Sequence, residues 1–96
     1  MKPSIALNLH RKEIRQIVEQ YHAKNARVFG SVIYGNDTEA SDLDLLVEPT
    51  SQTTFFDIAK IQNQLQKILQ VPVDVLTPKA LPERFRAQIL QEAVPV

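Results

Sequence analysis

The segment Asp42-Leu43-Asp44-Leu45-Leu46-Val47 constrains the fold more than any other, because acidic and aliphatic residues alternate at its start. Successive side chains of a β-strand point to opposite faces of the sheet. Asp42 and Asp44 are therefore expected on one face, and Leu43 and Leu45 on the other. A strand of this kind is buried on at least one face. The sequence thus predicts a sheet that presents two carboxylates together on its other face.

Helical and extended segments surround this strand. Apolar residues recur at spacings of three and four over residues 7–23, 53–69 and 82–93, which predicts three amphipathic helices. Short apolar runs at residues 26–29 and 73–76 predict two further strands. The order helix, strand, strand, helix, strand, helix favours an α+β (two-layer α/β) fold, in which a small mixed β-sheet of three to four strands packs against helices.

Three phenylalanines and the apolar end of the chain complete the expected packing. Phe55, Phe56 and Phe85 occupy helical positions and are expected in the core. The ending Val94-Pro95-Val96 is apolar, which indicates contact with another chain.

Length and charge limit the class of protein. A chain of 96 residues is expected to form a single domain over residues 1–96. Eleven basic and eleven acidic residues give a formal net charge of zero, so stable nucleic-acid binding is not expected. No apolar run is long enough to span a bilayer, cysteine is absent, and the N-terminus lacks a signal-peptide pattern, so no membrane association and a cytoplasmic location are expected.

Acidic residues are concentrated between positions 37 and 48, which carry five acids and no cation. Packed charges of one sign repel each other unless they are solvated or neutralised, so this stretch is either a wet loop or a metal site. Asp42 and Asp44 are spaced so that their carboxylates can converge on Mg²⁺, whereas solvated charges at a sheet edge are the alternative. Asp74 lies between two valines of another predicted strand and joins them if the two strands are neighbours.

The only two glycines, Gly30 and Gly35, frame the segment that follows the first predicted strand. A glycine directly after a strand lets the backbone turn sharply and present N–H groups, and Ser31 adds a hydroxyl. Such a turn suits a phosphate, although an ordinary strand-to-helix turn has the same sequence pattern. The two histidines, His10 and His22, are twelve residues apart and lack metal-ligand spacing.

Taken in order, Gly30-Ser31, Ser41–Val47 with its Asp-Leu-Asp, and Val73-Asp74-Val75 resemble the signature of the DNA polymerase β-like nucleotidyltransferase superfamily. The chain's size is similar to that of the minimal members, the MNT nucleotidyltransferases that act as antitoxins to HEPN-domain toxins. The resemblance implies the nucleotidyltransferase fold. It also implies that Asp42, Asp44 and Asp74 are catalytic and bind two Mg²⁺ ions. The residues that it implies for nucleotide binding are Gly30, Ser31 and Ser41.

By the same resemblance, the protein transfers AMP from ATP to a hydroxyl, expected to be a tyrosine of a cognate HEPN ribonuclease toxin with which it forms a hetero-oligomer. A homodimer is the alternative to this hetero-oligomer. A non-catalytic antitoxin that neutralises the toxin by binding alone is the alternative function, and a small-molecule nucleotidyltransferase is a third. Tyr34 departs from the family pattern, which commonly has arginine there, so Arg27, Lys24 or Lys79 is a candidate compensating cation.

Overall fold

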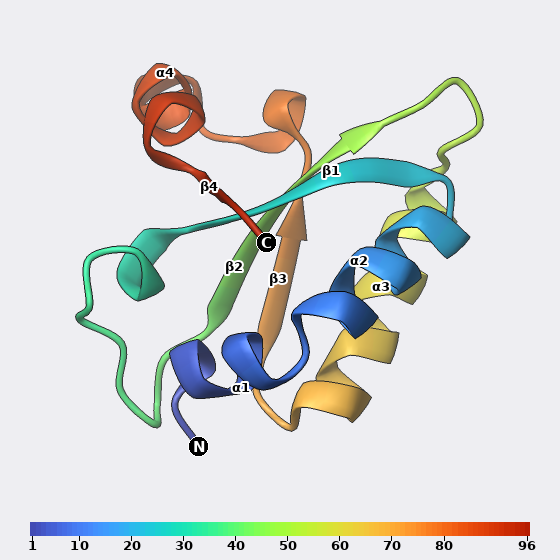
Figure 1. Ribbon diagram of the computed structural model, residues 1–96. Helices are drawn as coiled ribbons and strands as arrows, with labels where there is room; N and C mark the ends of the chain where they lie inside the picture. Colours follow the sequence, from blue (N-terminus) through green and yellow to red (C-terminus); the bar gives the residue numbers. More distant parts are fainter.

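The computed structural model describes residues 1–96 and places helices on both faces of a mixed sheet (Figure 1). In chain order the elements are α1 (Pro3–Leu9), α2 (Arg11–Gln20), β1 (Ala23–Phe29), the 3₁₀ turn η1 (Gly30–Val32), β2 (Leu43–Pro49), α3 (Phe55–Leu69), β3 (Val73–Leu76), the 3₁₀ turn η2 (Pro78–Ala80), α4 (Glu83–Glu92) and β4 (Val94–Pro95). The predicted α+β class is confirmed. None of the helices combines the length and the apolar character needed to cross a membrane.

The four strands form one sheet in the order β3-β2-β1-β4. β1 pairs with β2 and β4 in antiparallel fashion, whereas β2 and β3 are parallel. The parallel pair is joined through α3, which packs against β3 and α2 on one side of the sheet. Because β2 is central, its side chains are constrained on both faces.

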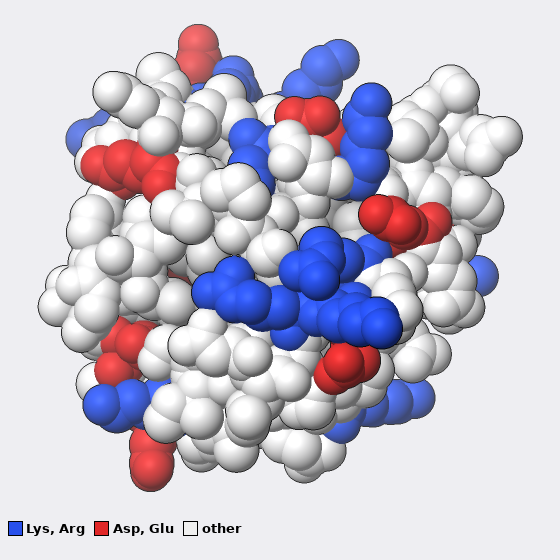
Figure 2. All heavy atoms as spheres, in the orientation of Figure 1, with Lys and Arg blue, Asp and Glu red and all other residues white.

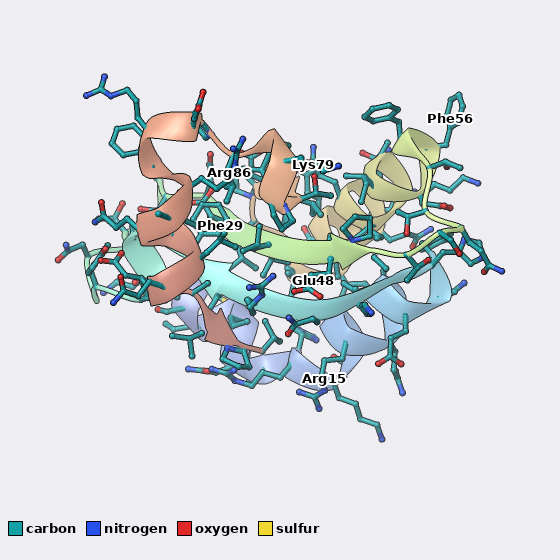
Figure 3. The ribbon with its side chains drawn as sticks, turned by 90° about the horizontal axis from the view of Figure 1, so that it is seen from above. Arg15, Phe29, Glu48, Phe56, Lys79 and Arg86 are labelled. Carbon is teal, nitrogen blue, oxygen red and sulfur yellow. The ribbon has the colours of Figure 1, made fainter.

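Two apolar layers cover the two faces of the sheet. The larger one packs α1, α2 and α3 against the sheet, and its members on β2 are Leu43, Leu45 and Val47. On the other face Phe29 and Leu46 pack with Leu81, and Ile89 of α4 lies against them (Figure 3). Leu46 is therefore buried on the face that also carries the acidic residues.

The single helix predicted over residues 7–23 is wrong: the structure has two helices that meet at His10. The backbone of His10 leaves the helical region (φ −130°, ψ 25°), and its N–H reaches back only to the carbonyl of Leu7. The break changes the direction of the chain between α1 and α2 (Figure 1), so that Leu7 and Ile14 both join the same buried layer. The strand that follows begins at Ala23, three residues before the predicted start.

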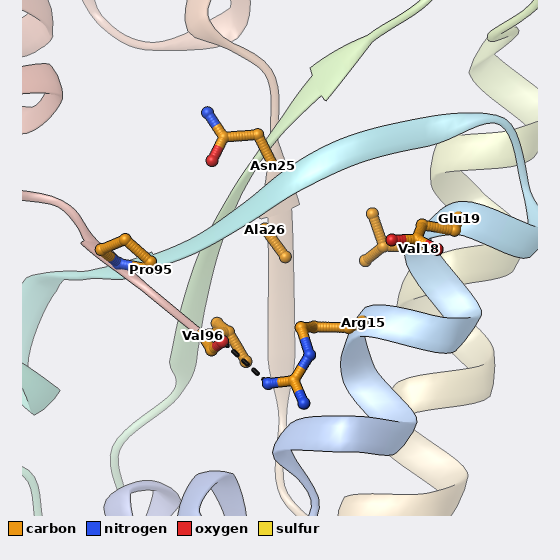
Figure 4. A pocket seen from close by; sticks show the side chains of 7 residues that line it. All are labelled: Arg15, Val18, Glu19, Asn25, Ala26, Pro95 and Val96. Carbon is orange, nitrogen blue, oxygen red and sulfur yellow. Dashed lines mark hydrogen bonds between the residues drawn. The ribbon is translucent and has the colours of Figure 1, made fainter.

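The apolar end of the chain is used inside the protein. Val94 and Pro95 form β4, which pairs with Val28 and Arg27 of β1. The backbone N–H of Val96 donates to the carbonyl of Ala26 at 3.0 Å, and Arg15 donates to the carbonyl of Val96 at 2.9 Å (Figure 4). The contact with another chain expected from this ending is therefore not required to explain its composition.

Placing the three phenylalanines in the core is also wrong. Phe55 is 94% exposed, Phe56 is 78% exposed, and Phe85 is exposed as well. The buried stripe of α3 runs through Ile61, Leu65 and Leu69, and its next position toward the N-terminus, four residues earlier, is Asp57 rather than a phenylalanine. Figure 3 shows Phe56 projecting from the start of α3 into solvent.

Asp57 lies in the first turn of α3 and is buried because its side chain caps the start of this helix. Its carboxylate accepts from the backbone N–H of Thr54 at 2.9 Å, and the Thr54 hydroxyl accepts from the N–H of Asp57 at 3.2 Å. This reciprocal capping box satisfies helix N–H groups that have no partner within the helix. His22 lies against the same carboxylate at 3.2 Å. Together, the Thr54 backbone hydrogen bond and His22 hold the pKa of Asp57 below its usual range.

The outer edge of β3 is closed by side chains of α3. The N–H of Val73 donates to Gln66 Oε1 at 3.1 Å, and the N–H of Val75 donates to Gln62 Oε1 at 3.1 Å. Both groups would otherwise be open donors on an edge strand. The opposite edge is β4, which is two residues long and contains Pro95.

Candidate active site

The acidic residues of β2 and β3 meet on the face of the sheet opposite the larger apolar layer. Asp44 and Asp74 are register partners across the parallel pair, so their Cα atoms lie about 4.8 Å apart and their side chains share a face. Leu43 and Leu45 on either side of Asp44 are fully buried. The predicted alternation of β2, and the predicted neighbouring position of Asp74, are confirmed.

Asp42 lies directly before β2 rather than within it. The backbone N–H of the next residue, Leu43, donates to the carbonyl of Pro72 at 2.8 Å, which fixes the start of β2 against the start of β3. The side chain of Asp42 is exposed at this point. It is close enough to Asp44 for its charge to raise the pKa of that group.

The glycine turn lies against Asp44. Phe29, the last residue of β1, is the register partner of Asp44 on the antiparallel side, so Gly30 emerges directly beside this carboxylate. Gly30 has φ +80°, and a Cβ at this position would collide with Asp44 Oδ2. Only glycine combines this backbone conformation with this close approach. Ser31 follows within η1 and is half-buried.

The environment of Asp44 disfavours an uncompensated negative charge. Partial burial, followed by the charges of Asp74 and Asp42, raises the pKa of Asp44 to about 6. Desolvation and nearby like charges both favour the protonated form of a carboxyl group. A cation placed between these carboxylates would remove both penalties.

Asp37, in the same acidic stretch, has a partner outside the site. Asp37 accepts from the backbone N–H of Ser4 at 2.8 Å, and this contact holds the pKa of Asp37 below its usual range. The loop before β2 is thereby tied to the first turn of α1. The Ser41 hydroxyl accepts from the N–H of Thr38 at 2.9 Å and closes a turn within the loop, so its role in nucleotide binding stays a prediction. Asp37 thus caps the start of α1. The sequence signals a helix start at Pro3, but it does not signal that Asp37 is the capping residue.

None of the candidate cations is seen at the carboxylates. Arg27 pairs with Glu48 at 3.3 Å, toward the other end of β2. Lys24 is exposed opposite Glu48. Lys79 follows the C-terminal end of β3 (Figure 3), whereas Asp74 is near the start of this strand. Lys and Arg side chains instead form a band across the face that carries α1 and α2 (Figure 2).

Tyr34 makes a contact that sequence reasoning missed. It lies just beyond η1 and is 54% exposed, and its hydroxyl donates to the Glu92 carboxylate at the end of α4. The hydrogen bond to Glu92 raises the pKa of Tyr34. The two residues are 58 positions apart, and no short-range sequence pattern links them, so only the structure reveals this contact.

The carboxylates of this site are chemically suited to Mg²⁺, but they do not form a complete coordination shell. Carboxylate oxygens are the ligands that Mg²⁺ prefers, and a few of them suffice because the ion retains water and binds substrate phosphates. Asp44 and Asp74 supply such oxygens from adjacent strands. No three acidic or histidine side chains are close enough to hold an ion on their own. The arrangement is that of an open site that a phosphate-bearing substrate would complete.

Residues 12–96 match the family described as Polymerase beta, Nucleotidyltransferase. The chain belongs to the polymerase β nucleotidyltransferase family. This confirms the resemblance found in the sequence and the nucleotidyltransferase class of enzyme.

Relatives of this nucleotidyltransferase cover almost its whole length. A Methanocaldococcus jannaschii protein, provisionally named a protein adenylyltransferase, is 32% identical over 90 residues, which are 94% of this chain and 97% of the relative. The protein adenylyltransferase MntA of Thermococcus cleftensis is 29% identical over 88 residues, which are 92% of this chain and 86% of MntA.

Solved structures share the fold. One described provisionally as a minimal nucleotidyltransferase matches with a TM-score of 0.86 at 36% identity, over 97% of this nucleotidyltransferase and 95% of that chain. A crystal structure of a toxin-antitoxin with AMP-PNP matches with a TM-score of 0.73 at 16% identity, over 88% of this chain and 69% of that one.

Proposed function

We propose that this nucleotidyltransferase transfers AMP from ATP to a tyrosine hydroxyl of a HEPN ribonuclease toxin and thereby acts as the antitoxin of a toxin-antitoxin pair. The observation that carries the proposal is the pairing of Asp44 with Asp74 on adjacent parallel strands, directly beside the Gly30 turn. The names of its relatives, protein adenylyltransferases that include MntA, support the choice of a protein as acceptor.

Each part of the site has a distinct role in this reaction. The backbone N–H groups of the turn at Gly30 and Ser31 bind phosphate oxygens of ATP. Asp42 and Asp44 would hold Mg²⁺ together with the triphosphate, and Asp74 would complete the ligand set. When bound there, the ion would neutralise charge on the phosphates and lower the pKa of the attacking hydroxyl. The hydroxyl oxygen forms a bond to the α-phosphorus, the bond between the α-phosphorus and the pyrophosphate oxygen breaks, and Asp74 accepts the hydroxyl proton.

The test is intact mass spectrometry of the candidate toxin encoded beside this protein, after incubation with the nucleotidyltransferase, ATP and Mg²⁺. We expect the toxin to gain one or more AMP masses. Asp44→Asn should abolish the gain, because it removes a ligand charge at the centre of the site. Glu39→Gln is the matched control: it also removes one charge from the acidic stretch, but from an exposed side chain outside the site.

Neutralisation by binding alone makes the opposite prediction. A variant with Asp42, Asp44 and Asp74 all changed to Asn would then still protect cells from the toxin and would still form the complex. The catalytic proposal would be refuted by two results together: the triple variant protects cells, and the wild-type enzyme adds no AMP to the toxin. Loss of protection with the complex intact would support it.

A further inference from the structure

Tyr34, Glu92 and Gln88 form a hydrogen-bonded chain beside the glycine turn. The Tyr34 hydroxyl donates to Glu92 Oε2, and Gln88 Nε2 donates to Glu92 Oε1 at 3.2 Å. The phenol oxygen therefore has a carboxylate in contact with its proton, and this carboxylate is oriented by a third group. A nucleophile, a base and an orienting group in contact are the usual components of an activated hydroxyl.

Backbone hydrogen bonds keep Tyr34 close to the turn that abuts Asp44. The N–H of Ile33 donates to the carbonyl of Gly30 at 3.2 Å, and the N–H of Asn36 donates to the carbonyl of Ser31 at 3.0 Å. Tyr34 lies between these two bonds, within one turn of the glycine. The Tyr34 side chain is 54% exposed rather than packed in the core, so it is accessible from solvent beside the turn.

The other hydroxyls of the loop between β1 and β2 lack such a partner. The Ser41 and Thr38 hydroxyls lie 3.4 Å from each other inside the closed turn before β2. Ser31 has no carboxylate at its hydroxyl. The other tyrosine of the chain, Tyr21, is half-buried against the main core, with the Lys60 ammonium 6.0 Å from its ring centre. Tyr34 is therefore the one hydroxyl of this loop that combines exposure with a poised proton acceptor.

We propose that Tyr34 is itself an acceptor of AMP, so that the nucleotidyltransferase modifies its own glycine loop when no partner protein is bound. The inference rests on the proposed function, because it uses the same transfer from ATP. Tyr34 Oη forms a bond to the α-phosphorus, the bond between the α-phosphorus and pyrophosphate breaks, and the phenol proton passes to Glu92. Glu92 is needed as the general base: its carboxylate already accepts the hydrogen bond of the Tyr34 hydroxyl, so it can take the phenol proton as the bond to phosphorus forms.

The experiment incubates the full chain with Mg²⁺ and ATP labelled at the α-phosphate, without any partner, and follows the label on the protein. We expect incorporation of one AMP per chain, located on Tyr34 by fragmentation mass spectrometry. Tyr34→Phe should abolish it, and Tyr21→Phe, the matched control, should retain it. Glu92→Gln keeps a hydrogen-bond acceptor but loses the base, so it should slow incorporation on the order of 100-fold.

Other results overturn the inference in distinguishable ways. Label in Tyr34→Phe at the wild-type rate, or on another residue, refutes the assignment of the acceptor. An unlabelled wild-type protein that nevertheless adenylylates the candidate toxin in the same mixture refutes self-modification and leaves the proposed function standing. Label on neither protein refutes both.

Discussion

Asp44 of β2 and Asp74 of β3 lie directly opposite each other in the parallel strand pair. Like charges at paired positions destabilise a sheet, and here one of the two is also half-buried, which raises the pKa of Asp44 to about 6. The folded protein thus maintains an arrangement that weakens it in the absence of a cation. Because the same arrangement favours cation binding, stability and metal affinity should be linked at this pair.

Changing Asp44 to Asn should abolish AMP transfer. At pH values above 6, it should also raise the melting temperature of the protein. The carboxyl has a pKa of about 3.9 in the unfolded chain and about 6 in the folded protein, so the folded state binds more protons between these values. Wild-type stability should therefore fall as the pH rises through this window, and the advantage of the Asn variant should disappear below about pH 4. Thermal melts from pH 4 to 8 measure this.

Mg²⁺ provides the complementary test of the same residue. A ligand that binds only the folded state raises its melting temperature, so millimolar Mg²⁺ should stabilise the wild type and leave Asp44→Asn unchanged. An Asn variant that is less stable than the wild type at pH 7, or one that still responds to Mg²⁺, would contradict this account of the site.

Gly30→Ala should reduce AMP transfer much more than Gly35→Ala. Both glycines have positive φ, +80° and +70°, so both substitutions introduce backbone strain of roughly 1 kcal/mol. Only the alanine at position 30 also meets the Asp44 carboxylate, because nothing lies within 4 Å of a Cβ at position 35. Steady-state kinetics with matched thermal melts separate the two effects. Equal losses of activity in the two variants would show that strain alone accounts for them.

The capping box of α3 should contribute stability that depends on pH. Thr54→Ala should cost about 1 kcal/mol of unfolding free energy, since it removes the acceptor for the N–H of Asp57. Asp57→Ala should destabilise the protein above about pH 4, and the difference should fade as the pH drops through the lowered folded pKa of Asp57. Urea unfolding at pH 7 and pH 3 tests both variants. A pH-independent difference for Asp57→Ala would argue against a role for its charge.

The phenylalanines should differ sharply in their effect on stability. Phe55→Ala and Phe56→Ala should change the unfolding free energy by no more than about 0.5 kcal/mol, because both rings are exposed. Phe29→Ala removes a buried ring beneath α4 and should cost about 3 to 4 kcal/mol. Chemical denaturation gives all three values. A large loss at Phe55 would place it in an intermolecular contact instead.

The sequence predicted β2, β3 and α3 well because these elements carry strong local signals. The alternation around Asp44, the two valines around Asp74 and the apolar spacing over residues 53–69 each depend on residues a few positions apart. Bringing Asp74 to Asp44 needed only one further assumption, that the two strands are neighbours. The acidic centre of the site was therefore predictable as a pattern, and the structure adds its register.

The errors arose where long-range contacts override local patterns. The periodicity from Leu7 to Tyr21 contains no signal for the break at His10, which depends on how two short helices fit one sheet face. Phe55 and Phe56 match a helical pattern, but the capping role of Asp57 sets which side of α3 is buried. The Tyr34–Glu92 contact and the pairing of β4 with β1 join distant segments and were not predictable from spacing.

The glutamines on α3 have a consequence for how this protein meets others. Gln62 and Gln66 occupy the N–H groups of Val75 and Val73 on one edge of the sheet, and β4 on the other edge is two residues long and contains Pro95, so both edges are poorly suited to pair with a strand of another molecule. We therefore expect other proteins to bind through helix and loop surfaces, where contacts form and separate without a change of strand pairing. A transferase must release its modified product before it can act again, and contacts of this kind allow release. The same two edges should also resist edge-to-edge aggregation at high protein concentration.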